Sequence, residues 1–298
     1  MSASPTLWFW LVTFALHAGC RAGGPEPVDD FLELGDSRIH YRAEGTGPVV
    51  LLAHGGYLDL SIWDPQARYL RDRYRVVRFS DHGHGRTVSG LADPPPARAI
   101  IDALTGATAA EPVMLVGHSW GAMLCVDYAL AYPERVRQLV LLAPGLQGWT
   151  YFQDSTAARL DAARRAAWAA GDTAAVARLF HQTWVVGPRR EARALDSAFV
   201  ASSLGLIEAN MRRHGGADWS VLAELPAIDR LDGLAVPTVI LVGEYDAEDI
   251  HLVAAEYARR SPRVSVRQLE GLAHLLARED STRVNRILGA VLDLDRGR

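Results

Sequence analysis

The sequence predicts an α/β fold built on a mostly parallel, doubly wound sheet, because short apolar segments alternate with segments of helical composition. The chain has 298 residues, of which 49% are hydrophobic, enough to bury one large core. The alternation stops in the middle of the chain and resumes near the end. We therefore expect a helical insertion within a single α/β unit.

The expected strands are short, apolar and bounded by glycine, proline or polar residues. In chain order they cover residues 31–34, 39–42, 49–53, 75–79, 113–116, 138–143, 238–242 and 264–269. The first two are joined by Gly35-Asp36-Ser37, which is typical of a hairpin. Helices are expected over residues 97–104, after three prolines, and over residues 122–130.

The insertion is expected over residues 146–231, and residues 29–145 and 232–298 form the α/β core around it. Its helical segments, 156–170, 173–185 and 190–213, are separated by glycine-containing breaks. A solvated helical bundle would satisfy this pattern. Its position between two strands of the sheet favours a cap over the ends of the strands.

Residues 1–28 form a leader that is not part of the fold. Residues 7–16 are an apolar run, too short to span a membrane and typical of a signal-peptide core. The small residues before Cys20 resemble a bacterial lipoprotein cleavage box, which predicts lipidation of Cys20, a membrane tether and export to the cell envelope. His17 and the lack of a basic residue before the run depart from that pattern. Simple cleaved export, an uncleaved anchor, or a cytoplasmic protein with a mis-assigned start remain alternatives.

The composition limits the kinds of partner that we expect the protein to bind. The 31 basic and 35 acidic residues are spread along the chain and leave a net charge of −4, so no basic patch predicts nucleic-acid binding. Two cysteines cannot form a disulfide framework. His82 and His84 lack further ligands at metal spacing, so we expect no metal and no other cofactor. A small-molecule substrate is the expected partner, and the sequence does not predict the oligomeric state.

Ser119 lies at the centre of Gly117-His118-Ser119-Trp120-Gly121, between an apolar strand segment and a helical segment. A serine on a sharp strand-to-helix turn has its hydroxyl exposed above the sheet, and the helix N-terminus directs backbone amides to the same place. Such a turn needs small residues beside the serine. The context therefore favours a nucleophilic serine over a structural Gly-Ser turn.

A serine hydroxyl needs a base, usually a histidine that is oriented by a carboxylate. His274 and Asp246 each follow an expected strand, and the carboxyl ends of parallel strands meet at one edge of a sheet. We therefore expect Ser119, Asp246 and His274 to converge. The other candidates for the acid are Glu244, Glu248 and Asp249.

These segments together resemble the α/β-hydrolase fold family, in its cap-bearing, esterase- and lactonase-like branch. The similarity covers roughly residues 31–292 and is weak only in the insertion. Its motifs are the oxyanion-type loop His54-Gly55-Gly56 with Trp63, the loop 83–87, the turn 117–121, the stretch 131–141 and the loops 243–246 and 271–274. His82 replaces the arginine usual in its loop, and Ser80-Asp81 is shifted from the common aspartate, so we expect the local geometry of that loop to differ from the family's.

The resemblance implies that the backbone N–H groups of Gly56 and Trp120 form an oxyanion hole, with Tyr57 as the alternative to Gly56. It also implies hydrolysis of a small ester, thioester or lactone through an acyl-serine. A serine nucleophile argues against the dehalogenase and epoxide hydrolase branches. A proline-iminopeptidase-like aminopeptidase, a C–C hydrolase, a perhydrolase and a non-catalytic ligand-binding relative remain alternatives, and no cap residue is assigned to the site.

Overall fold

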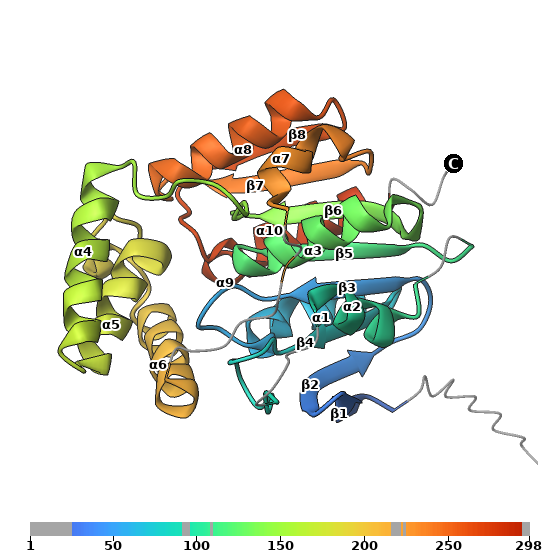
Figure 1. Ribbon diagram of the computed structural model, residues 1–298, viewed down its shortest axis with the longest axis horizontal. Coiled ribbons are helices and arrows are strands. Elements are labelled where there is room, and N and C mark those ends of the chain that lie inside the picture. The colour runs from blue at the N-terminus through green and yellow to red at the C-terminus, as the bar shows by residue number, and fades with distance from the viewer. Residues whose placement is uncertain (1–25, 91–95, 108–109, 216–221, 223–224, 294–298) are drawn as a thin grey trace, which may run out of the picture.

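The computed structural model describes residues 26–90, 96–107, 110–215, 222 and 225–293 (Figure 1). The leader lies outside this part of the chain apart from its last three residues, so the prediction for Cys20 is not tested. Val28, the last residue assigned to the leader, already belongs to the first strand of the sheet. Among the described helices, none combines the length and apolarity needed to cross a membrane.

The core is one eight-stranded sheet with the order β1-β2-β4-β3-β5-β6-β7-β8. The strands are β1 Val28–Leu34, β2 Ser37–Glu44, β3 Val49–Ala53, β4 Arg75–Phe79, β5 Val113–His118, β6 Val136–Leu142, β7 Thr238–Gly243 and β8 Val264–Leu269. β2 is antiparallel to both β1 and β4, and every other pair is parallel. The predicted fold class is confirmed.

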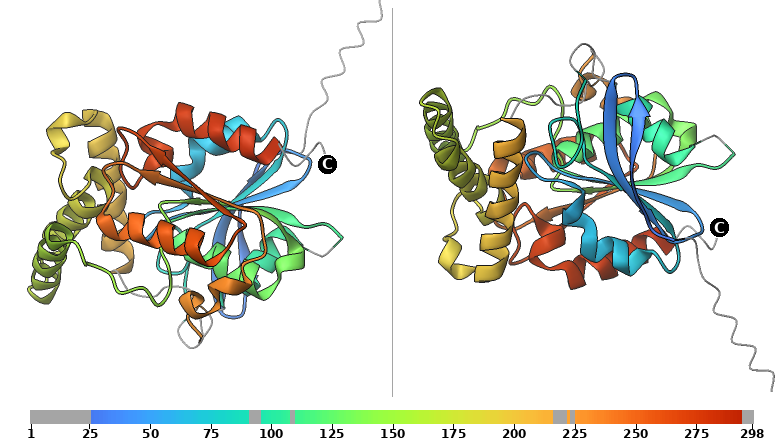
Figure 2. Two further views of the ribbon diagram at one scale, coloured as in Figure 1. Left: turned by 90° about the horizontal axis from the view of Figure 1, so that it is seen from above. Right: turned by 90° about the horizontal axis from the view of Figure 1, so that it is seen from below.

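Helices cover both faces of the sheet, which is why the central strands are apolar throughout. Figure 2 shows α1 and α10 on one face and α2, α3 and α8 on the other. Their bounds are α1 Asp64–Leu70, α2 Ala97–Thr105, α3 Trp120–Ala131, α8 Glu248–Arg260 and α10 Ser281–Asp293, with the short α9 Leu276–Glu279 before α10. Every residue of β5 is buried, so the strand that leads to Ser119 is held from both sides.

The insertion forms a separate layer of helices beside the carboxyl ends of the parallel strands (Figure 1). It contains α4 Ser155–Ala169, α5 Thr173–Phe180, a π-helical turn His181–Val186 and α6 Ser197–His214. The short α7 Ala227–Arg230 packs instead against α3 of the core. Single 3-10 turns occupy Leu60–Trp63, Pro133–Arg135, Ala192–Ala194 and Leu231–Gly233.

Two helices of the insertion differ from the sequence expectation. A single helix over 190–213 is wrong, because α6 begins only at Ser197, where the Asp196 side chain accepts a hydrogen bond from Phe199 N at 2.7 Å. An aspartate in this position satisfies an N–H group that the first helical turn leaves unpaired. The expected helix over 173–185 changes at His181 into a π-helical turn, which has no distinct residue pattern.

Candidate active site

Ser119 lies on the sharp turn between β5 and α3, with φ 51° and ψ −111°. A positive φ is rare for a residue with a side chain and costs about 1–3 kcal/mol, so the surrounding structure must impose it. Backbone hydrogen bonds do so: Ser119 N donates to Leu142 O at 3.0 Å, and Ser119 O accepts from Gly145 N at 3.1 Å. The turn therefore holds its serine in one orientation.

Two glycines beside the serine are required by close packing. A Cβ on Gly117 would lie 2.6 Å from Ala122 Cα, and one on Gly121 would lie 2.3 Å from Ala53 O. Neither glycine has a positive φ. The expectation of small residues here is thus met, because the turn brings β3, β5 and α3 too close together for a side chain.

His274 is bound to Asp246 as a buried pair. Its Nδ1 lies 3.0 Å from Oδ1 and 2.9 Å from Oδ2 of the carboxylate, and Oδ1 also accepts from Ala247 N at 2.8 Å. Both side chains are at most 5% exposed. Because the carboxylate can only accept, Nδ1 carries the proton, and Nε2 of the neutral ring is left as a proton acceptor.

The other candidate acids have different partners. Asp249 is fully buried and accepts hydrogen bonds from Phe152 N and Gln153 N, at the start of the insertion. Glu244 accepts from Gly271 N at 2.8 Å, and Glu248 is exposed. Among the four carboxylates, Asp246 is the one that contacts the histidine.

The turn of Ser119 and the loop of His274 meet through His118. His118 Nε2 donates to His274 O at 2.9 Å, and the two rings lie 5.0 Å apart. Burial, followed by the charge of His274, holds the pKa of His118 well below its ordinary value, so this ring is neutral. Within the described ranges no hydrogen bond joins the Ser119 hydroxyl to the His274 ring; such contacts often tighten only when substrate binds.

The loop after β3 covers the serine. A Cβ on Gly55 would lie 2.5 Å from His118 Nδ1 and 3.2 Å from Ser119 Cβ. Tyr57, with φ 56°, donates its N–H to His84 Nε2 at 3.0 Å. The Tyr57 N–H is thus directed away from a reacting carbonyl, whereas that of Gly56 has no partner in the described part of the chain.

Two buried histidines support this loop. His54 Nε2 accepts from Asp81 N at 2.9 Å, its Nδ1 donates to Gly55 O at 2.8 Å, and its ring lies 4.9 Å from that of His84. Burial, and then the charge of His54, lowers the pKa of His84 to about 3. Both rings are therefore neutral supports for the backbone. Among the described residues, no group of three or more metal-ligating side chains comes together.

Aromatic side chains of the insertion complete the site. The Trp184 ring lies 5.1 Å from the His274 ring, and Phe152 lies 6.0 Å from Trp184. Tyr57 contacts Phe180 edge-on at 4.7 Å. Sequence reasoning missed Trp184, because it lies on the π-helical turn, where helical spacing does not indicate which side faces the core.

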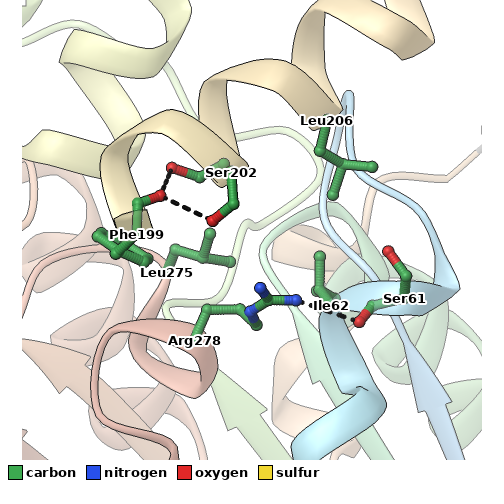
Figure 3. Close-up of a pocket in the computed structure, with 8 residues that line it drawn as sticks. Ser61, Ile62, Phe199, Ser202, Leu206, Leu275 and Arg278 are labelled. Atoms are coloured by element: carbon green, nitrogen blue, oxygen red, sulfur yellow. Dashed lines mark hydrogen bonds between the residues drawn. The ribbon is translucent and has the colours of Figure 1, made fainter. Parts of the chain in front are cut away.

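A cavity of about 150 Å³ lies where α6 meets the core (Figure 3). Leu275, directly after His274, lines it together with Arg278, whose Nη1 donates to Ser61 O at 3.3 Å. The remaining lining residues are Ile62, Phe199, Ser202, Ser203 and Leu206. This cavity therefore adjoins the histidine loop at the joint between insertion and core.

The fold and this site define a class of α/β proteins in which a serine lies on a strand-to-helix turn and a histidine–carboxylate pair lies in a neighbouring loop. Residues 48–280 match the family model of the alpha/beta hydrolase fold, and the chain belongs to that family.

One curated relative and two solved structures of the same fold are similar to the chain. The chain is 29% identical over 131 residues to a 2-hydroxy-6-oxo-6-phenylhexa-2,4-dienoate hydrolase of Comamonas testosteroni, a match that covers 40% of this chain and 44% of the relative, less than half of its length. A thermophilic esterase from Thermogutta terrifontis superposes with a TM-score of 0.67 at 21% identity, covering 90% of this chain and 98% of that one. Est816, described as an N-acyl homoserine lactone degrading enzyme, superposes with a TM-score of 0.66 at 19% identity, covering 87% and 99%.

Proposed function

We propose that the protein is a serine hydrolase that cleaves a small ester, thioester or lactone through an acyl-serine intermediate. The observation that carries this proposal is the buried His274–Asp246 pair, in contact through His118 with the strained turn that holds Ser119. An esterase and a lactone-degrading enzyme are among the proteins that share its fold.

In the proposed mechanism, His274 Nε2 takes the proton of Ser119 as the hydroxyl attacks the substrate carbonyl. The N–H groups of Gly56 and Trp120 face the oxygen on which negative charge develops. His274 then protonates the leaving group and activates the water that hydrolyses the acyl-serine. Asp246 stays ionised and stabilises the imidazolium.

Ester hydrolysis by the Ser119→Ala variant tests this proposal. We expect the wild-type protein to hydrolyse short-chain 4-nitrophenyl esters and the variant to lose about 10⁴-fold or more in kcat, as removal of a nucleophile does in related chemistry. Ser265→Ala is a matched control at an exposed position of β8, and it should stay within about twofold of wild type. Retained activity in folded Ser119→Ala would overturn the proposal. Turnover of a proline 4-nitroanilide without turnover of any ester would instead indicate an aminopeptidase.

A further inference from the structure

A groove of about 390 Å³ opens beside the proposed oxyanion loop. It is lined by Tyr57, which directly follows Gly56, and by Arg164, Arg165 and Trp168 of α4. One end of the groove is thus formed by the loop that covers Ser119, and its wall is formed by the insertion. The link between the groove and the proposed site is therefore Tyr57, which lines the groove and directly follows Gly56 in the chain.

The wall of the groove carries one net positive charge. Arg164 donates from Nε and Nη2 to Asp161 Oδ1 at 3.1 and 2.6 Å, and Arg165 Nη1 lies 3.1 Å from Asp161 Oδ2. The three residues share one face of α4, since positions three and four apart are neighbours on a helix. One buried carboxylate therefore orients two guanidinium groups and neutralises only one of them. Asp161 binds the Nε–Nη2 edge of the Arg164 guanidinium group, and Nη1 lies outside this edge.

The remaining two side chains make the groove amphipathic. Trp168 is 45% exposed, which is unusual for a large apolar residue. The Tyr57 ring packs edge-on against Phe180, and Tyr57 and Arg164 line the same groove. Burial raises the pKa of the Tyr57 phenol, and the charge of Arg164 opposes this effect. A protonated phenol, an indole and a partly neutralised guanidinium pair are suited to a carbon chain that ends in an anion.

We propose that this groove, the Arg164/Arg165 groove, binds a carboxylate at the far end of the substrate's acyl chain. The inference rests on the proposed function and names its substrate class: monoesters of short dicarboxylic acids. In the proposed mechanism His274 protonates the leaving group, and its ring lies 5.1 Å from that of Trp184. We therefore infer that the alcohol lies beside these two rings and that the acyl chain lies on the side of the oxyanion loop and the groove. A single carboxylate matches the single net charge, whereas a phosphate dianion would not be balanced.

Two methyl esters with acyl chains of equal length test the groove. Monomethyl adipate and methyl hexanoate differ only at the far end, where one has a carboxylate and the other a methyl group. We expect the wild-type kcat/KM to favour monomethyl adipate about tenfold, the effect of one charge-assisted hydrogen bond. The preference should decline as salt is added, because screening weakens interactions with a partly exposed charge.

Arginine variants then test whether the preference for monomethyl adipate depends on the groove. Arg164→Gln should lower kcat/KM for monomethyl adipate about tenfold, and the more exposed Arg165→Gln about threefold, while methyl hexanoate changes less than about twofold. Arg159→Gln removes the same charge from the same helix outside the groove, and it should leave both substrates unaffected. Should Arg164→Gln unfold the insertion, Arg165→Gln and the triple variant Asp161→Asn/Arg164→Gln/Arg165→Gln, which leaves no buried charge unpaired, give the same test.

Failure of the groove and failure of the proposed function are distinguishable. Hydrolysis of methyl hexanoate with no preference for monomethyl adipate, or a preference unchanged in the arginine variants, would overturn the groove alone. If wild type hydrolyses neither ester, binding of the two esters to Ser119→Ala, measured by calorimetry, still tests the groove. Tighter binding of monomethyl adipate than of methyl hexanoate, weakened when Arg165→Gln is added, supports the groove. Equal binding of the two esters overturns it.

Discussion

Replacing Asp246 with asparagine should leave His274 in place but prevent it from acting as a base. In the structure, Oδ1 of Asp246 accepts from Ala247 N, and Oδ2 is the oxygen nearer to His274 Nδ1. The side-chain oxygen of the introduced asparagine would remain with the Ala247 N–H, because an amide nitrogen cannot accept that bond. The NH₂ group would then face Nδ1, and Nδ1 would have to accept.

The His274 ring would therefore adopt the tautomer that cannot act as a base. With Nδ1 unprotonated, the neutral ring carries its proton on Nε2 and cannot take the proton of Ser119. The corresponding change in a serine protease lowers kcat about 10⁴-fold, and the same loss is expected here, equivalent to about 5 kcal/mol of transition-state stabilisation. The melting temperature should change little, because the buried side chain keeps its size and two of its contacts.

Asp249→Asn and Glu244→Gln are the matched controls, because each removes one carboxylate charge from the same region. Both carboxylates accept from backbone N–H groups, which an amide oxygen can also do for one donor. We expect kcat for a 4-nitrophenyl ester within about tenfold of wild type, with up to about 1–3 kcal/mol of lost stability for Asp249→Asn. If folded Asp246→Asn keeps more than a tenth of the wild-type kcat, or folded Asp249→Asn loses it, the reasoning is refuted.

Three further predictions follow from the packing around the site. His118→Phe keeps an aromatic side chain but loses the bond to His274 O, and it should lower kcat about 10-fold to 100-fold with KM nearly unchanged, measured by ester hydrolysis. Gly121→Ala places a methyl group against Ala53 O and should cost about 1–3 kcal/mol or more, measured by urea unfolding. As the pH is lowered from about 6.5, the free energy of unfolding should decrease by up to about 1.4 kcal/mol per pH unit on account of His84. The pKa of His84 is about 3 in the folded protein, so in this pH range the unfolded chain binds more protons at this residue than the folded protein does.

Each of these three has a contrary result. A His118→Phe variant with wild-type kcat would show that the bond to the histidine loop does not position the base. A Gly121→Ala variant as stable as wild type would show that β3 and α3 can move apart. If His84→Gln, which preserves a donor and an acceptor, does not make the acid dependence shallower, then His84 is not responsible for it.

The parts of the fold with strong local patterns could be predicted from the sequence. The apolar run of β5, the glycines around Ser119 and the helical residues after it leave few alternatives to a strand, a sharp turn and a helix. The carboxyl-end rule then predicted that the loops of Asp246 and His274 would meet, and the structure joins those two side chains by hydrogen bonds. These features depend on residues close together in the sequence or on one topological rule.

The features that sequence reasoning missed depend on contacts between distant segments. The orientation of Trp184 follows from a π-helical turn that has no sequence pattern, and the start of α6 depends on which aspartate caps the helix. The bond from His118 to the His274 carbonyl depends on how two loops meet, and no sequence pattern indicates it. The proximity of Arg164 to Tyr57 likewise depends on the placement of the insertion over the core.

Labelling with a fluorophosphonate probe tests the central claim most directly, because the probe reacts with a serine that a neighbouring base has activated. Peptide mass mapping of the folded wild-type protein should find the adduct on Ser119, with slower labelling in His274→Gln and none after unfolding in urea. Folded protein that remains unlabelled at Ser119, or that is labelled equally fast without His274, would contradict the account.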